Sequence, residues 1–163
     1  MSQSCLDCPQ RPDRVFCDLA PDALQEFDGI KSLHVHPRGT ILFREGQPAR
    51  GVFLLCEGRV RLTVCSESGR RMTLRVASAG EVLGLSATLA GGCYEVTAEV
   101  LEPLQAAEVR RRDLLSFLRE HGETCMHVVH LLSEDLHMAY DRVRTVGLVR
   151  TRHSHPHGPV LTH

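Results

Sequence analysis

The middle of the chain alternates apolar and polar residues in short runs separated by glycine. Residues 59–65 are apolar at every second position, and residues 71–76 repeat this alternation. A period of two is typical of an antiparallel strand with one buried face, and the short polar segment 66–69 predicts a hairpin turn between the strands. In the second run, the residues expected to face the core are Met72, Leu74 and Val76. Many short strands separated by glycine indicate a β-sandwich, barrel or jelly roll.

Segments with a helical period flank these strands. Residues 18–30 begin with Asp18, a capping residue, and Pro21, which suits the first turn. Residues 111–120 have one apolar side, and residues 123–149 form a longer amphipathic segment. The predicted fold class is therefore mainly β with flanking helices.

The long helix has an apolar seam whose members are spaced alternately by four and three residues, as in the a and d positions of a coiled coil. The seam consists of Cys125, Val129, Leu132, Leu136, Ala139, Val143 and Val146. A narrow seam favours a partner helix, so these residues are the predicted homodimer interface. The alternative is a single helix packed against its own domain.

Composition limits the location and the chemistry of the protein. The 163 residues suit one domain with appendages, and a net charge of -1 gives no general attraction to nucleic acid or membrane. No apolar run approaches the roughly 18 residues of a membrane span, and the polar start lacks a secretory signal, so we expect a cytoplasmic protein. Seven cysteines, an odd number, favour reduced thiols or metal ligands over disulfides. Because no set of nucleophile, base and acid can be placed, we do not expect an enzyme.

The order of glycines and strands resembles the effector domain of the Crp/Fnr superfamily, a cyclic-nucleotide-binding-like β-roll of bacterial transcription regulators. The resemblance covers roughly residues 18–148. The residues that carry it are Gly39, Leu42, Phe43, Glu45, Gly46, Glu57, Gly58, Val60, Gly69, Gly80, Glu81, Gly84 and Leu101. It implies a double-stranded β-helix (jelly roll) followed by a dimerisation helix.

The predicted organisation has four parts. Residues 1–17 form an arm that contains cysteines, residues 18–122 the β-roll, residues 123–149 the dimerisation helix, and residues 150–163 a disordered, histidine-rich tail. In the resembled family, a DNA-binding helix-turn-helix domain follows the long helix. Here the chain ends, so we expect it to sense an effector without reading DNA, unless a longer form supplies that domain. The alternative is a stand-alone ligand-binding or interaction module.

The second glycine cluster is where the resembled family holds a cyclic nucleotide. There, a glutamate contacts the ribose and an arginine pairs with the cyclic phosphate, and these two positions fall at Leu85 and Glu95 in this chain. A carboxylate would repel the phosphate, and Glu81 and Glu99 are expected to make the region still more negative, so cyclic AMP is not the expected effector. The candidate effector pocket consists of Gly80, Glu81, Val82, Leu83, Gly84, Leu85, Glu95 and Val96.

Cys5, Cys8 and Cys17 form a candidate metal site, since thiolates suit zinc and iron–sulfur clusters. The Fnr branch carries a similar cysteine set and takes a fourth ligand from the roll, where this chain has Ala107. Cys56, Cys65 and Cys93 are substitutes for it, although Cys56 and Cys65 also fit strand positions. The alternative is an unliganded arm that is sensitive to oxidation.

Histidines supply two further candidates. His34 and His36 invite comparison with the cupin metal motif, but the next glutamate, Glu45, lies too far along the chain, so we interpret them as solvated strand residues. His130 and His137 share a helix face with Glu134, an arrangement that also suits a solvated surface. A redox-sensing iron–sulfur protein and a cupin-like metalloenzyme are thus the less favoured alternatives.

Overall fold

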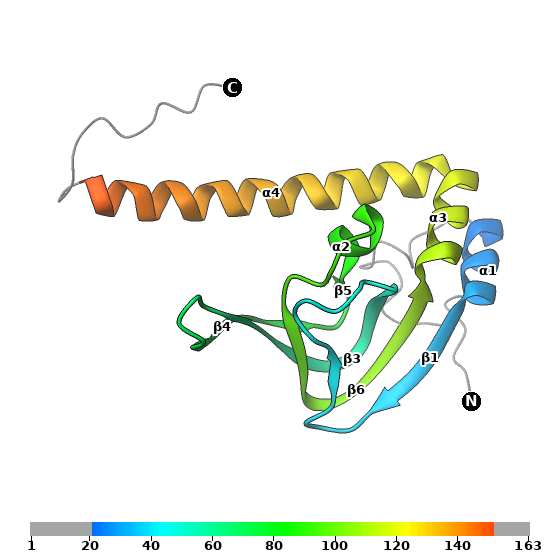
Figure 1. Ribbon diagram of the computed structural model, residues 1–163. Helices are drawn as coiled ribbons and strands as arrows, with labels where there is room; N and C mark the ends of the chain where they lie inside the picture. The colour runs from blue at the N-terminus through cyan, green and yellow to red at the C-terminus, as the bar shows by residue number, and fades with distance from the viewer. Residues whose placement is uncertain (1–20, 152–163) are drawn as a thin grey trace. The chain divides into compact units, whose positions relative to one another are not determined.

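The computed structural model describes the backbone of residues 21–151, and the side-chain burial of residues 21–144. Its elements run in the order α1 (Pro21–Ile30), β1 (Lys31–His36), β2 (Ile41–Phe43), β3 (Gly51–Cys65), β4 (Arg71–Ser78), β5 (Val82–Leu83), α2 (Leu85–Ala90), β6 (Thr97–Arg110), α3 (Arg111–Glu120) and α4 (Gly122–Thr151) (Figure 1). The predicted arm and most of the predicted tail lie outside the described residues.

All pairings between the strands are antiparallel. The central path of the sheet is β1-β6-β3-β4, while β2 also pairs with β6 and β5 also pairs with β3. β3 and β6, the two longest strands, curve side by side through the body of the roll (Figure 1). The expected class, an antiparallel β-roll with flanking helices, is confirmed.

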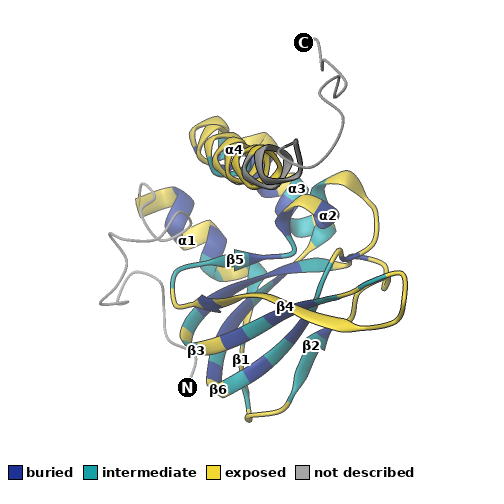
Figure 2. Ribbon diagram, turned by 90° about the vertical axis from the view of Figure 1, so that its left-hand side faces the viewer, coloured by how far each residue is buried: buried dark blue, intermediate teal, exposed yellow. Residues whose placement is uncertain are grey.

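The apolar side chains of the strands fill the inside of the roll. Val60, Val100, Leu104 and Ala106 are almost completely buried there and belong to one core cluster. A second set is buried where α1 and α3 meet, with the rings of Phe27 and Phe117 edge to face. Figure 2 shows the buried parts of β3 and β6, inside the roll, as dark blue bands. The apolar surface that these side chains remove from water is the main contribution to the stability of such a fold.

The expectation that Met72, Leu74 and Val76 face the core is wrong. Ala77 pairs with Val60, and both are buried to 0% exposure, so Ala77 occupies the inward position that the sequence pattern gave to Val76. A slip of one residue moves every side chain of a strand to the other face. The ladder also shifts register between Leu62 and Thr63. All three predicted core residues are more than 40% exposed on this edge strand.

α4, which spans Gly122–Thr151, confirms the predicted long helix. Of the predicted seam residues, Val129, Leu136 and Val143 are 48%, 53% and 66% exposed. Ala139 is also exposed, Cys125 and Leu132 are intermediate, and the side chain of Val146 lies outside the described ones. The seam is therefore uncovered over most of its described length in a single chain. No helix in residues 21–151 is both long enough and apolar enough to cross a membrane.

Candidate effector site

The corner between β5 and β6 is built on glycine. Gly84 caps the N-terminus of α2 with φ 80°, and Gly91 caps its C-terminus with φ 71°. Both angles lie in the left-handed region, which other residues enter only at a cost. The two glycines therefore let the chain enter and leave a helix of six residues within a tight corner.

Tyr94 fills the space inside this corner. A Cβ atom on Gly84 would lie 2.7 Å from the Tyr94 ring, so Gly84 also makes room for that ring. The ring stacks on Phe43 with centroids 4.0 Å apart. The Tyr94 hydroxyl donates to the carbonyl oxygen of Gly51 at 2.6 Å, and Thr88 Oγ1 donates to the same oxygen at 2.9 Å. Two side chains thus tie the corner to the start of β3.

Burial raises the pKa of Tyr94, although hydrogen bonds to the backbone of Gly51 and Arg50 act in the opposite direction. The phenol therefore stays protonated near neutral pH and serves as a hydrogen-bond donor. Sequence reasoning did not single out Tyr94. The available signal was a large aromatic residue two positions after a glycine pair, in a chain with only two tyrosines.

Arg111 closes the other side of the corner. Its Nε donates to the carbonyl oxygen of Thr88 at 2.8 Å, and its guanidinium group lies against Gly91. A cation at the C-terminal end of a helix interacts favourably with the carbonyl dipoles there. α2 is therefore fixed to α3 by a side chain that is occupied with a structural contact.

The predicted effector residues occupy different environments within the corner. Leu83 and Leu85 are buried at 3% and 5% exposure, and Val96 packs against the core cluster. Glu95 is exposed. The remaining members, all of intermediate burial, are Gly80, Glu81, Val82 and Gly84. The corner thus offers apolar side chains inside and the carboxylate of Glu95 at its surface.

The expectation that Glu81 and Glu99 leave the corner strongly negative is wrong. Glu81 forms an ion pair with Arg75 at 2.5 Å and also accepts a hydrogen bond from the backbone N–H of Ser78 at 2.7 Å. Glu99 lies 3.9 Å from Arg61. β3 supplies Arg61, which lies 38 residues before Glu99, and β4 supplies Arg75, which lies six residues before Glu81. Arg75, which pairs across the ladder with Leu62, is therefore already engaged by a carboxylate.

Two cavities lie beside Tyr94 rather than among the predicted pocket residues. The larger, about 360 Å³, is lined by Leu42, Phe43, Gln47, Pro48, Arg50, Phe53 and Tyr94. The smaller, about 140 Å³, shares Arg50, Phe53 and Tyr94 with it. Both combine apolar residues with Arg50, and the smaller is also lined by Glu108 and Arg110. A volume of this size suits a small ligand.

The thiol candidates are not brought together among the described residues. Cys5, Cys8 and Cys17 lie outside that part of the chain. Cys56 is of intermediate burial, and Cys65 and Cys93 are exposed. The Cys56 thiol donates to the carbonyl oxygen of Leu54 at 3.7 Å. An iron–sulfur cluster or zinc ion on the arm stays a prediction.

Ligand atoms of Glu26 in α1, Glu120 at the end of α3 and His121, the next residue, lie within 4.8 Å of one another. His121 Nε2 is 2.7 Å from Glu26 Oε2, and this hydrogen bond is the main cause that lowers the pKa of Glu26. Contact with Glu26 raises the pKa of Glu120. These groups therefore satisfy one another as a hydrogen-bonded cluster on the surface.

Comparison with known proteins agrees with this architecture. The sequence profile of the family described as "Cyclic nucleotide-binding domain" matches residues 33–121. The chain belongs to this family, in its Crp/Fnr type. It is 25% identical over 125 residues to the cyclic AMP receptor protein of Thermus thermophilus, covering 77% of this chain and 58% of that protein. It is 22% identical over 131 residues to the anaerobic regulatory protein of Bacillus subtilis, covering 80% and 55%.

Among solved structures, the crystal structure of the Thermus thermophilus catabolite activator protein matches this cyclic nucleotide-binding domain with a TM-score of 0.75 and 23% identity. The match covers 82% of this chain and 62% of that one. This likeness confirms the fold. The chain spans little more than half the length of the two curated relatives.

Proposed function

We propose that this chain is the effector-sensing part of a Crp/Fnr-type transcription regulator whose effector is not a cyclic nucleotide. One observation carries the proposal: in the corner that holds the nucleotide in the family, Leu85 is buried among apolar groups and Glu95 is exposed at the surface. Leucine cannot bond a ribose hydroxyl, and a carboxylate cannot pair with a phosphate.

The electrostatic cost of bringing a phosphate close to the Glu95 carboxylate also argues against a cyclic nucleotide. Two like charges about 4 Å apart near a protein surface repel by roughly 4 kcal/mol, at an effective dielectric constant near 20. Two arginines of the β3–β4 ladder, Arg75 and Arg61, already form ion pairs with Glu81 and Glu99. Recruiting either arginine for a phosphate would break an existing ion pair.

We place the effector at the cavities beside Tyr94. Apolar residues line both cavities, while Gln47 and Arg50 are polar residues of the larger and Arg50, Glu108 and Arg110 are charged residues of the smaller. Such a site favours a small, largely apolar ligand that carries one anionic or polar group. The eight corner residues then act as the support of this site, because Gly84 contacts the Tyr94 ring directly.

We further propose that two chains pair through α4 as a homodimer. The exposed apolar seam, with Leu136 at its centre, supports this, since burial against a twin would remove those side chains from water. The relatives named above are regulators, and in such an assembly an effector at the roll would bias the packing of the helix pair. We propose that the whole regulator, a cytoplasmic protein, binds DNA, and we assign no DNA contact to residues 21–151.

A gain-of-function pair tests the central assignment. Leu85→Glu together with Glu95→Arg would install the two family groups in the corner. If the corner keeps the family geometry and lacks only these groups, the double variant binds cyclic AMP at least about tenfold more tightly than the wild type. The charge control is Glu45→Arg, which reverses a carboxylate outside the corner as Glu95→Arg does within it. Equal binding by the wild type and the double variant would contradict the proposal.

A further inference from the structure

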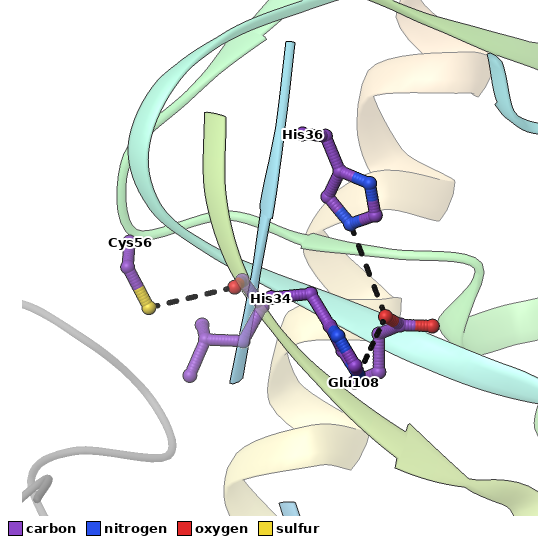
Figure 3. A network of polar contacts seen from close by, with 5 residues as sticks. His34, His36, Cys56 and Glu108 are labelled. Atoms are coloured by element: carbon purple, nitrogen blue, oxygen red, sulfur yellow. Dashed lines mark hydrogen bonds and ion pairs between the residues drawn. The ribbon is translucent and has the colours of Figure 1, made fainter. Parts of the chain in front are cut away.

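His34, His36 and Glu108 converge on one face of the roll. In the β1–β6 ladder, His34 is opposite Ala106 and His36 is opposite Leu104, two residues of the inner core cluster. Glu108 lies two positions beyond Ala106 on the same face. Figure 3 shows the carboxylate of Glu108 between the two imidazole rings. The interpretation of these histidines as solvated strand residues is wrong for His36, whose side chain is only 20% exposed.

The spacing within this trio differs from that of hydrogen bonds. Glu108 Oε2 lies 3.5 Å from His34 Nε2 and 3.9 Å from His36 Nε2. Hydrogen bonds between such atoms are about 2.7–3.2 Å long, so neither contact is one. Two ligand atoms about 2.1 Å from one tetrahedral ion are about 3.4 Å apart. The carboxylate therefore stands near the distance at which ligands of a common ion lie, whereas the two imidazole rings, with centroids 6.2 Å apart, must move closer together to share that ion.

His36 supplies an independent observation. Its Nε2 is buried and has no hydrogen-bond partner, although buried polar atoms are paired in the great majority of cases. This nitrogen lies 3.9 Å from the carboxylate oxygen, a gap that an ion can bridge. His34 is 53% exposed on its side chain, so its ring is free to rotate toward the ion. The contrast is with Glu26 and His121, which satisfy each other at 2.7 Å.

We propose that His34, His36 and Glu108 bind a divalent transition-metal ion. Two imidazole nitrogens and one carboxylate oxygen suit Zn²⁺, Co²⁺ or Ni²⁺ rather than Ca²⁺ or Mg²⁺, which prefer oxygen. Three protein ligands leave a position open for water or a small ligand. The site is separate from the glycine corner, but Glu108 also lines the smaller cavity beside Tyr94, so an ion here would border the proposed effector site.

Zinc titration of the full chain tests the site. Wild-type protein should bind one equivalent of Zn²⁺ that His36→Gln and Glu108→Gln lose or bind more than about 100-fold more weakly, since even an outer-shell partner is worth about 10–100-fold. The matched control is His130→Gln, which removes an exposed histidine that pairs with Glu134 on α4. Zinc held by cysteines or by the other histidines stays the same in all these variants.

A direct readout distinguishes loss of the site from loss of the fold. In wild-type protein, the imidazole nitrogen resonances of His34 and His36 should shift together as the first equivalents of Zn²⁺ are added, while circular dichroism shows the variants to be folded. Unchanged resonances for both rings, or an unchanged zinc stoichiometry in folded His36→Gln and Glu108→Gln, would overturn the proposal.

Discussion

Tyr94 stacks on Phe43 inside the roll, with ring centroids 4.0 Å and ring planes 21° apart. This contact joins the residue after the glycine corner to β2, which is paired with β6. The Tyr94 ring thus borders the corner on one side and the two cavities on the other. The stability of the corner and the shape of the proposed effector site depend on the same side chain.

The first prediction concerns the shared hydrogen bond at Gly51. Tyr94→Phe keeps the stacked ring and removes one donor, while Thr88 still donates to the carbonyl oxygen. We expect the free energy of unfolding to fall by about 0.5–1.5 kcal/mol in urea denaturation. Thr88→Val should behave similarly. The double variant leaves the carbonyl without either donor, so its loss should exceed the sum of the two single losses; simple additivity would argue against a shared acceptor.

The second prediction separates the two roles of Gly84. Gly84→Ala forces a side chain into the left-handed region and also brings its Cβ to 2.7 Å from the Tyr94 ring. Gly69→Ala is the matched control, since Gly69 has φ 83° and nothing within 4 Å of an added Cβ. We expect Gly84→Ala to be more destabilising than Gly69→Ala by about 1–3 kcal/mol, the usual cost of overpacking. Equal losses would show that the ring yields freely.

How far the sequence predicts this fold can be judged from particular residues. The helix over residues 111–120 was predicted with its observed bounds, because its apolar side and its length are local properties. The inward face of β4 was not predicted correctly, because alternation of apolar and polar residues separates the two faces of a strand without showing which face meets the core. Ala77, a small residue, is the one that faces the core.

The candidate site shows the same limit. Gly84 and Gly91 shape the backbone of the corner through positive φ angles. Tyr94 and Glu108 were missed, because their partners Gly51 and His36 lie more than 40 residues away in the chain. The arginine partner of Glu99 was missed for a similar reason, since Arg61 lies 38 residues before it. A single sequence does not fix the register of strands that bring such groups together.

The third prediction concerns the pH dependence of the Glu26 cluster. The pKa of Glu26 is lowered chiefly by its hydrogen bond to His121, so this contact stabilises the fold above the ordinary glutamate range and is lost as pH falls through the lowered pKa. The raised pKa of Glu120 acts oppositely, costing stability as pH rises through that range. In a carboxyl-carbon NMR titration, Glu26 should therefore titrate below Glu120.

His121→Phe tests the cause. It keeps a ring against Phe117 and removes the hydrogen bond to Glu26, so the pKa of Glu26 should rise toward its ordinary value. His130→Gln, on α4, should leave the titration of Glu26 unchanged. If Glu26 titrates identically in wild type and His121→Phe, the assigned cause is wrong.

The fourth prediction concerns assembly. Leu136→Glu would place two carboxylates face to face in the proposed dimer seam, and burial of unpaired charges is strongly unfavourable. We expect the dimer to weaken by at least about 100-fold, so that the variant sediments as a monomer with the β-roll still folded. Met138→Glu is a matched control, because Met138 is 54% exposed against 53% for Leu136 and lies about 200° around the helix.

Sedimentation of the wild type completes this test. A dimer at tens of micromolar that persists in Met138→Glu and is lost in Leu136→Glu supports the seam. A wild-type monomer at roughly that concentration would contradict the seam and would favour the alternative, in which α4 packs against its own chain.

Isothermal titration calorimetry of the wild-type chain with cyclic AMP tests the central claim most directly. With Leu85 and Glu95 in the positions of the family's ribose-binding and phosphate-binding groups, we predict no saturable heat at protein concentrations of tens of micromolar, roughly the range in which weak binding is detected. Saturable binding with a micromolar Kd, abolished by a change within the corner, would contradict the account.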